Sequence, residues 1–200
     1  MPDTLCRRSP LSNLASATVL SGRAEAGVIL TERPFCGHLN LRGNPNEHAF
    51  IAGAERSLGL ALPLQTNMVS SNSSVAALCL GPDEWLLITP PSVEHEVACG
   101  LRDILRGLSF AVTNITDGQT IFRLYGSSAT DVLRKGCSLD LHPRTLRPGC
   151  CAQTSIAKAG VLIHYVDQSP SFELVVRRSF AEYLALWLKD AATEYGFRVI

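Results

Sequence analysis

The sequence predicts an α+β protein built from two ferredoxin-like βαββαβ halves, each of roughly 100 residues. Three observations lead to this fold class. Strand-like and helix-like segments follow one another in the order β-α-β-β-α-β, and this order occurs twice. Gly, Pro and Asp residues mark turns between the segments, and capping residues mark the helix starts. We place the halves at residues 25–118 and 119–200, together forming one compact unit.

Two strands and a helix are expected at the start of the first half. The segment "GVILTERPFCGHLNLRG" (27–43) holds two β-prone runs separated by Pro34. The helix that follows should begin at Pro45, which suits the first helical position, with Asn44 as its N-cap. Gly59 should end this helix in the left-handed conformation.

Two further strands, a helix and a hairpin complete the first half. The segment 75–89, "VAALCLGPDEWLLIT", predicts two strands around a turn at residues 81–83. Apolar residues at helical spacing predict a helix within 90–107. Asp117 and Gly118 then form a strong hairpin signal between two β-prone runs.

The second half repeats the pattern. A short helix is expected at 127–136, and Gly136 should close it in the left-handed conformation. Strands are predicted at 150–157, 160–167 and 171–177. The clearest helix of the chain follows at 179–196, with a capping box and a long apolar stripe, and residues 197–200 could supply a final strand.

Residues 1–24 are polar, serine-rich and aperiodic, so we expect a flexible N-terminal arm. The first residues lack the basic-then-apolar order of a signal peptide. No stretch approaches the roughly 18 apolar residues of a membrane span. We therefore expect no membrane association.

The composition narrows the possible partners and compartment. The chain has 18 basic and 18 acidic residues, so it carries no net charge to attract nucleic acid. A neutral chain with 46% hydrophobic residues has little self-repulsion and tends to associate. The seven cysteines are odd in number and form no CxxC pair, which favours a reducing, cytoplasmic compartment.

The residue patterns reveal no catalytic or metal constellation. The sequence has neither GxGxxG nor GxxxxGK[ST], the usual nucleotide-binding loops. Cys137, His142, Cys150, Cys151 and His164 could be soft metal ligands, but they lack the paired spacing of structural zinc sites. A catalytic Cys137 is also disfavoured, because the negative end of the preceding helix opposes thiolate formation. We predict no catalytic residue and no metal ligand.

Two stretches remain as candidate sites. Asp83 and Glu84 are adjacent carboxylates in an apolar context, and we favour a polar turn over a ligand contact there. In "RKGCSLDLHPRT" (134–145), apolar and polar residues alternate after the helix end, so Asp140 and His142 should face outward together. Arg144 follows them. We expect this edge to contact a neighbouring subunit.

Three segments closely resemble one protein family. They are "LGPDEWLLITP" (80–90), "KGCSLDLHPRTLRPGCCAQTSIA" (135–157) and "FELVVRRSFAEYLALWLKDAATEYG" (172–196). The family is the gamma subunit of heterotetrameric bacterial sarcosine oxidase. The resemblance spans nearly the whole chain and is most specific in its second half.

This resemblance implies a fold similar to the folate-binding domain of the glycine cleavage T-protein. It also implies a non-catalytic place beside alpha, beta and delta subunits, in a complex that oxidatively demethylates sarcosine. That complex yields glycine, hydrogen peroxide and 5,10-methylene-tetrahydrofolate. Its FAD, FMN, NAD, tetrahydrofolate and zinc are implied to be held by the other subunits.

Two alternatives stay open. The chain could be a stand-alone folate-binding module, in which Asp83 or Glu84 would grip the pterin amide edge through a charge-assisted bond. It could also be the gamma subunit of a related flavoenzyme that acts on another N-methyl amino acid.

Overall fold

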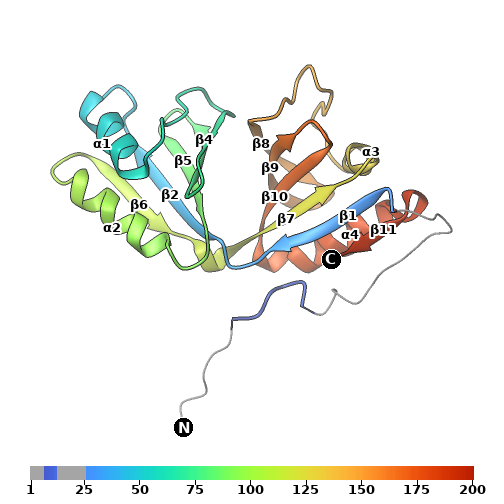
Figure 1. Cartoon of the computed structure of the whole chain (residues 1–200). Coiled ribbons are helices and arrows are strands. Elements are labelled where there is room, and N and C mark those ends of the chain that lie inside the picture. Colours follow the sequence, from blue (N-terminus) through green and yellow to red (C-terminus); the bar gives the residue numbers. More distant parts are fainter. Residues whose placement is uncertain (1–6, 13–25) are drawn as a thin grey trace, which may run out of the picture.

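The computed structural model describes residues 7–12 and 26–200 and shows an α+β fold with two β-sheets. The sheets diverge like the arms of a V, with helices on the outer side of each (Figure 1). The predicted α+β class is confirmed. Within the described part of the chain, no helix is both long and apolar enough to cross a membrane.

The first sheet has the strand order β3-β4-β5-β2-β6, and every neighbouring pair is antiparallel. Its strands are β2 (Gly37–Gly43), β3 (Val69–Ser71), β4 (Ala76–Gly81), β5 (Glu84–Thr89) and β6 (Phe110–Asn114). The helices α1 (His48–Leu58) and α2 (Glu94–Ile104) cover its outer face.

The second sheet has the strand order β11-β1-β7-β10-β9-β8, with β1 and β11 parallel and the other pairs antiparallel. Its strands are β1 (Val28–Arg33), β7 (Gln119–Tyr125), β8 (Cys150–Ile156), β9 (Ala159–Asp167), β10 (Ser171–Arg177) and β11 (Phe197–Val199). The helices α3 (Ala129–Arg134) and α4 (Arg178–Ala191) cover its outer face. The 3₁₀ turns are η1 (Thr116–Gly118) and η2 (Thr193–Tyr195).

The structure does not show the two equal halves that the element order suggested. The strand at 28–33, expected in the first half, is β1 and lies between β7 and β11 of the second sheet. β1 pairs with β7 over five residues and with β11 over three, so this N-terminal strand connects β11 to the rest of the second sheet. A division of the chain at residue 118 therefore does not separate the two sheets.

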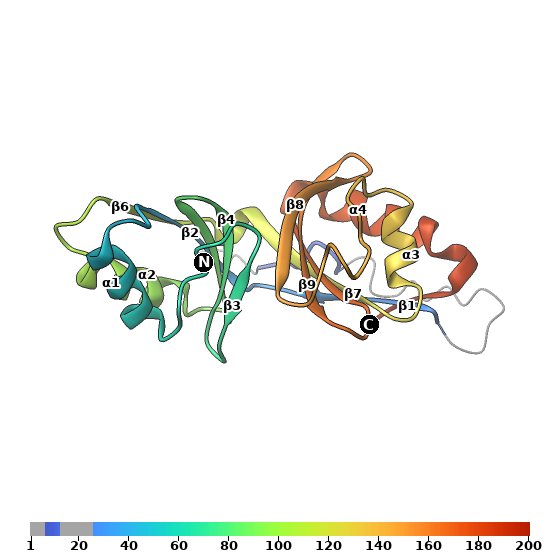
Figure 2. The same cartoon turned by 90° about the horizontal axis from the view of Figure 1, so that it is seen from above.

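Three apolar cores hold the layers together. One lies between each sheet and its helices, and the third lies between the sheets. The buried residues of this inter-sheet core are Cys36, Leu78, Leu86, Ile88, Ile121, Cys151, Leu162 and Val175. The sheets also touch at one edge, beside β3 and β8 (Figure 2). There the backbones of Met68 and Cys150 form an isolated antiparallel β-bridge, and the N–H of Val69 donates to Gly149 O at 2.9 Å.

The chain passes between the sheets twice, at residues 34–36 and 115–118. The two crossings are joined, because the N–H of Ile115 donates to His38 O at 2.9 Å and the N–H of His38 donates to Thr116 Oγ1 at 3.0 Å. The predicted hairpin at Asp117 and Gly118 is therefore wrong. Thr116 is anchored to β2, and the turn directs β7 into the other sheet.

Residues 7–12 of the expected flexible arm pack across these crossings. Arg7 pairs with Asp117 at 2.8 Å, and its guanidinium lies 5.3 Å from the centroid of the Phe35 ring. The side chain of Leu11 is buried in the core of the second sheet. The segment thus ties one crossing to the other, while residues 1–6 and 13–24 of the arm lie outside the described residues.

Three helix ends differ from expectation. The capping box predicted for the last helix is not formed, because α4 begins at Arg178 without a side-chain capping bond. Asn44 does not cap α1 but organises a turn before it, accepting from the N–H of Asn46 at 3.0 Å, so the helix begins at His48. Gly59 is left-handed as predicted, with φ 65°. Gly136 is not left-handed. It is required for space, because an added Cβ would lie 2.5 Å from the Trp187 ring.

His38 is a fully buried histidine beside the crossings. Neither of its ring nitrogens makes a hydrogen bond of normal geometry among the described residues. Burial lowers its pKa to about 4, and the nearby backbone of Cys36 offsets only part of that effect. As the pH falls, the imidazole of His38 therefore takes up a proton in the unfolded chain before it does so in the folded protein. The free energy of unfolding decreases as the pH falls from the pKa of His38 in the unfolded chain to its pKa in the folded protein.

We predict that the free energy of unfolding falls by up to about 3 kcal/mol between pH 6.5 and pH 4 through His38 alone. Denaturant unfolding of the wild type and of His38→Phe at several pH values measures this, because the carboxylates common to both chains cancel in the comparison. Parallel pH profiles of the two chains would contradict the prediction.

Candidate functional site

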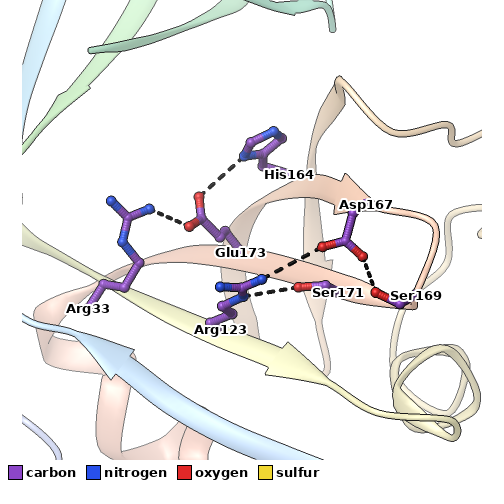
Figure 3. Close-up of polar contacts among 7 residues, drawn as sticks. All are labelled: Arg33, Arg123, His164, Asp167, Ser169, Ser171 and Glu173. Atoms are coloured by element: carbon purple, nitrogen blue, oxygen red, sulfur yellow. Dashed lines mark hydrogen bonds and ion pairs between the residues drawn. The ribbon is translucent and has the colours of Figure 1, made fainter. Parts of the chain in front are cut away.

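Among the residues that the structure describes, the most buried ionic cluster lies on the second sheet and faces the first (Figure 3). Arg33, at the end of β1, forms an ion pair with Glu173 of β10. His164 Nδ1 of β9 lies 3.3 Å from the other carboxylate oxygen of Glu173. The side chains of Glu173 and His164 are only 10% and 12% exposed. Three strands therefore meet at one carboxylate.

The charge of Glu173 is maintained by its partners. Burial by itself would raise the pKa of this carboxyl group, but His164 and Arg33 together hold it below its usual value. The pKa of Arg33 is raised, because the attraction of Glu173 outweighs the opposing effect of burial. With both of its oxygens engaged, the carboxylate links strands and presents no unpaired base.

A second polar group continues from the cluster toward the end of the same sheet (Figure 3). Arg123 Nε donates to Ser171 Oγ at 3.0 Å, and the Arg123 guanidinium lies 3.7 Å from Asp167. Ser169 donates to Asp167 in turn. These contacts join β7, β9 and β10.

Three hollows open around the inter-sheet core. The smallest, ≈ 220 Å³, lies between the ionic cluster and the loop 71–75 of the first sheet. A second, ≈ 590 Å³, lies between the loop 65–68 and the segment 139–152, which includes the start of β8. A third, ≈ 560 Å³, is lined by both sheets and by Phe180 at the start of α4. Each hollow therefore lies where the two layers separate.

The two folate candidates do not converge. Asp83 lines a separate surface recess beside Asn44, whereas Glu84 lines the ≈ 560 Å³ hollow. Glu84 already accepts from Asn40 Nδ2 at 2.7 Å and from Arg42 at 2.5 Å. Gripping a pterin with Glu84 would therefore require an existing ion pair to open.

The stretch 134–145 has the exposure that its alternation predicts, with Leu141 buried and Asp140, His142 and Arg144 exposed. Asp140 folds the loop, since its carboxylate accepts from the N–H of His142 and from the Thr145 hydroxyl, both at 2.9 Å. These donors lower its pKa. The N–H of Arg144 donates to His142 Nδ1 at 3.1 Å. Asp140 and Thr145 also line the ≈ 590 Å³ hollow.

The soft ligands named from the sequence lie apart in different roles. Cys137 Sγ contacts Thr154, Cys150 Sγ lies 3.9 Å from Met68 Sδ, and His164 belongs to the ionic cluster. Cys151 lies in the inter-sheet core, where burial raises its pKa to about 12. In the described ranges, no three His, Cys, Asp or Glu side chains form a group able to hold a metal ion.

Sequence reasoning missed the ionic cluster. The sequence pattern places Arg33 only at the end of a β-prone run and offers His164 only as a soft metal ligand. The usable signal was Glu173, a carboxylate within the apolar strand "SFELVVR", because a charge on a buried strand needs a partner. The sequence could not supply the partners, which lie 140 and 9 positions away.

Comparison with known proteins places this architecture in a family. A family model described as sarcosine oxidase, gamma subunit family, matches residues 42–194. The sarcosine oxidase subunit gamma of Corynebacterium sp. (strain P-1) is 34% identical over 194 residues, covering 96% of this chain and 93% of the relative. That of Corynebacterium sp. (strain U-96) is 36% identical over 201 residues, with the same shares covered.

Solved structures lead to the same family as the sequence matches. A chain of the heterotetrameric sarcosine oxidase from Corynebacterium sp. U-96, in complex with pyrrole 2-carboxylate, superposes with a TM-score of 0.85 at 32% identity. The match covers 94% of this chain and 96% of that one. The glycine cleavage aminomethyltransferase T of Bartonella henselae matches with a TM-score of 0.64 at 14% identity, over 88% of this chain and 48% of that one. The second likeness is one of fold alone.

We predict that Glu173→Gln lowers the free energy of unfolding at pH 7 by about 1–3 kcal/mol, because Arg33 and His164 lose a buried charged partner. Glu84→Gln is the matched control. It also removes an ion-paired carboxylate, but a more exposed one, so about 1 kcal/mol or less is expected.

The loss in Glu173→Gln should shrink in acid. The pKa of Glu173 is lower in the folded protein than in the unfolded chain, so the charged carboxylate stabilises the fold at neutral pH. This stabilisation is lost as the pH falls through the pKa that Glu173 has in the folded protein. Denaturant melts at pH 7 and pH 3 measure this. Equal losses in the two glutamine variants at pH 7 would contradict the role of the cluster.

Proposed function

The chain belongs to the sarcosine oxidase gamma subunit family, and we propose that it acts as the non-catalytic gamma subunit of a heterotetrameric sarcosine oxidase. The observation that carries the proposal is the match with a chain of such an oxidase. That match combines a TM-score of 0.85 with 32% identity over nearly the full length of both chains.

In this proposal the chemistry belongs to the alpha, beta and delta subunits. They would hold the FAD, FMN, NAD, tetrahydrofolate and zinc implied by the family, and would convert sarcosine to glycine in the cytoplasm. The complex would release hydrogen peroxide and 5,10-methylene-tetrahydrofolate. This chain would hold those subunits in register.

Internal pairing of the conspicuous charged groups supports a structural role. Glu173 is bound by Arg33 and His164, Glu84 is bound by Arg42, and Asp140 folds its own loop. A catalytic acid or base needs a free position within hydrogen-bond reach of a substrate. These carboxylates instead stabilise the chain itself.

The exposed loop with His142 and Arg144 is one proposed contact with a neighbouring subunit. Charge reversal at Arg144 is a sharper probe than a change at Asp140, because Asp140 shapes the loop. We expect Arg144→Glu to weaken assembly of the four chains, measured by native mass spectrometry, while Arg56→Glu on α1 leaves it unchanged. Equal assembly of both variants would remove this loop from the interface.

We predict that omission of this chain prevents the other three subunits from forming a stable, fully active oxidase. The test co-expresses alpha, beta and delta with and without it, and measures complex mass and sarcosine-dependent hydrogen peroxide formation. A stable three-subunit complex with the full rate would contradict the proposed assembly role. Restoration by the separately purified chain would show that it acts by binding.

A further inference from the structure

Helix α4 has two apolar faces. Its inner face is buried in the core of the second sheet, through Ala181, Leu184, Ala185, Leu188 and Ala191. Its outer face carries Phe180, Tyr183 and Leu186, which are 40%, 37% and 47% exposed. Each follows the one before it by three positions, so the side chains lie along one side of the helix. An amphipathic surface helix would carry polar residues there.

The outer face has a defined geometry. The rings of Phe180 and Tyr183 stand edge to face with centroids 6.4 Å apart. The hydroxyl of Tyr183 accepts from the N–H of Lys158, 3.3 Å away in the β8–β9 turn. Large aromatic side chains with few rotatable bonds are typical anchors in protein interfaces.

The same face continues into the ≈ 560 Å³ hollow, because Phe180 lines both. Asn40 and Glu84 approach the hollow from the first sheet, and Gln153 approaches from the second. These three are engaged within the protein: Asn40 donates to Glu84 at 2.7 Å, and Gln153 donates to Leu80 O at 3.3 Å.

Two polar groups of the hollow lack partners in the described part of the chain. Gln119 Oε1 is buried and has no hydrogen-bond donor. Arg177, at the end of β10, is exposed and has no carboxylate within ion-pair distance. A buried acceptor without a donor is costly in a finished structure, so the hollow calls for an occupant with an N–H or O–H group. Arg177 calls for an acidic group on that occupant.

We propose that the outer face of α4 and this hollow form one docking surface for another subunit of the oxidase. The occupant is a chain segment that places a carboxylate at Arg177, a donor at Gln119 and an apolar side chain on Phe180, Tyr183 and Leu186. This inference rests on the proposed function, which supplies the partner chains. A folate or another small molecule could fill the hollow but would leave the outer face of α4 exposed.

The test uses the four-chain complex with a tag on the alpha subunit. Leu186→Asp places a charge on the outer face, and Arg177→Glu reverses the charge at the mouth of the hollow. We expect each to weaken retention of this chain by about tenfold or more. Leu64→Asp is the matched control, because Leu64 is 57% exposed, is not on α4 and does not line the hollow. Retention of this variant should stay within about twofold of wild type.

Hydrogen exchange of the wild-type complex provides a second test that does not depend on whether the variants fold. Amides of residues 177–187 that exchange in the free chain should become protected on assembly, whereas addition of a reduced folate alone should not protect them. Wild-type retention of both docking variants, or unchanged exchange at 177–187 while the chain remains in the complex, would overturn the docking surface and leave the proposed function standing. If the wild-type chain did not enter the complex, the proposed function itself would fail.

Discussion

The apolar contact between the two sheets is the constraint on which the rest of the structure depends. It requires one face of each sheet to be buried against the other, so helices can cover only the outer faces (Figure 1). It also fixes where the chain can cross, at residues 34–36 and 115–118, where His38 and Thr116 join the crossings. Several polar side chains of the inner sheet faces line the margins where the layers separate.

Those margins hold the buried ionic cluster and two polar groups without partners among the described residues. Glu173 closes one margin by binding Arg33 and His164, while Gln119 and Arg177 border another without partners in the described chain. Whether a polar group is paired within the chain therefore distinguishes groups that stabilise the fold from groups suited to bind a partner. A paired, buried carboxylate maintains the sheet, whereas a buried acceptor and an exposed cation beside apolar side chains suit a partner. A subunit that positions others needs both a fixed frame and such surfaces.

Local signals predicted the elements better than their arrangement. Alternation and turn residues located the strands around residues 81–83, and α4 was evident from its stripe, because these depend on neighbours in the sequence. The placement of β1 in the second sheet was not predictable, since its partners lie about 90 and 170 residues further on. Asp117 and Gly118 indicated a reversal but not the change of sheet. The outward positions of Asp140 and His142 followed from alternation, whereas the pairing of Glu173 required the fold.

In the proposed role, this chain supports the oxidase without supplying a chemical group. The most direct measurement is sarcosine turnover per mole of intact complex, with assembly verified by mass, for complexes carrying Glu84→Gln, His142→Ala or Glu173→Gln. We expect kcat to stay within about twofold of wild type in each, because none of these side chains touches reacting atoms. A fall of about a hundredfold or more in one fully assembled complex would contradict it and place a catalytic residue in this chain.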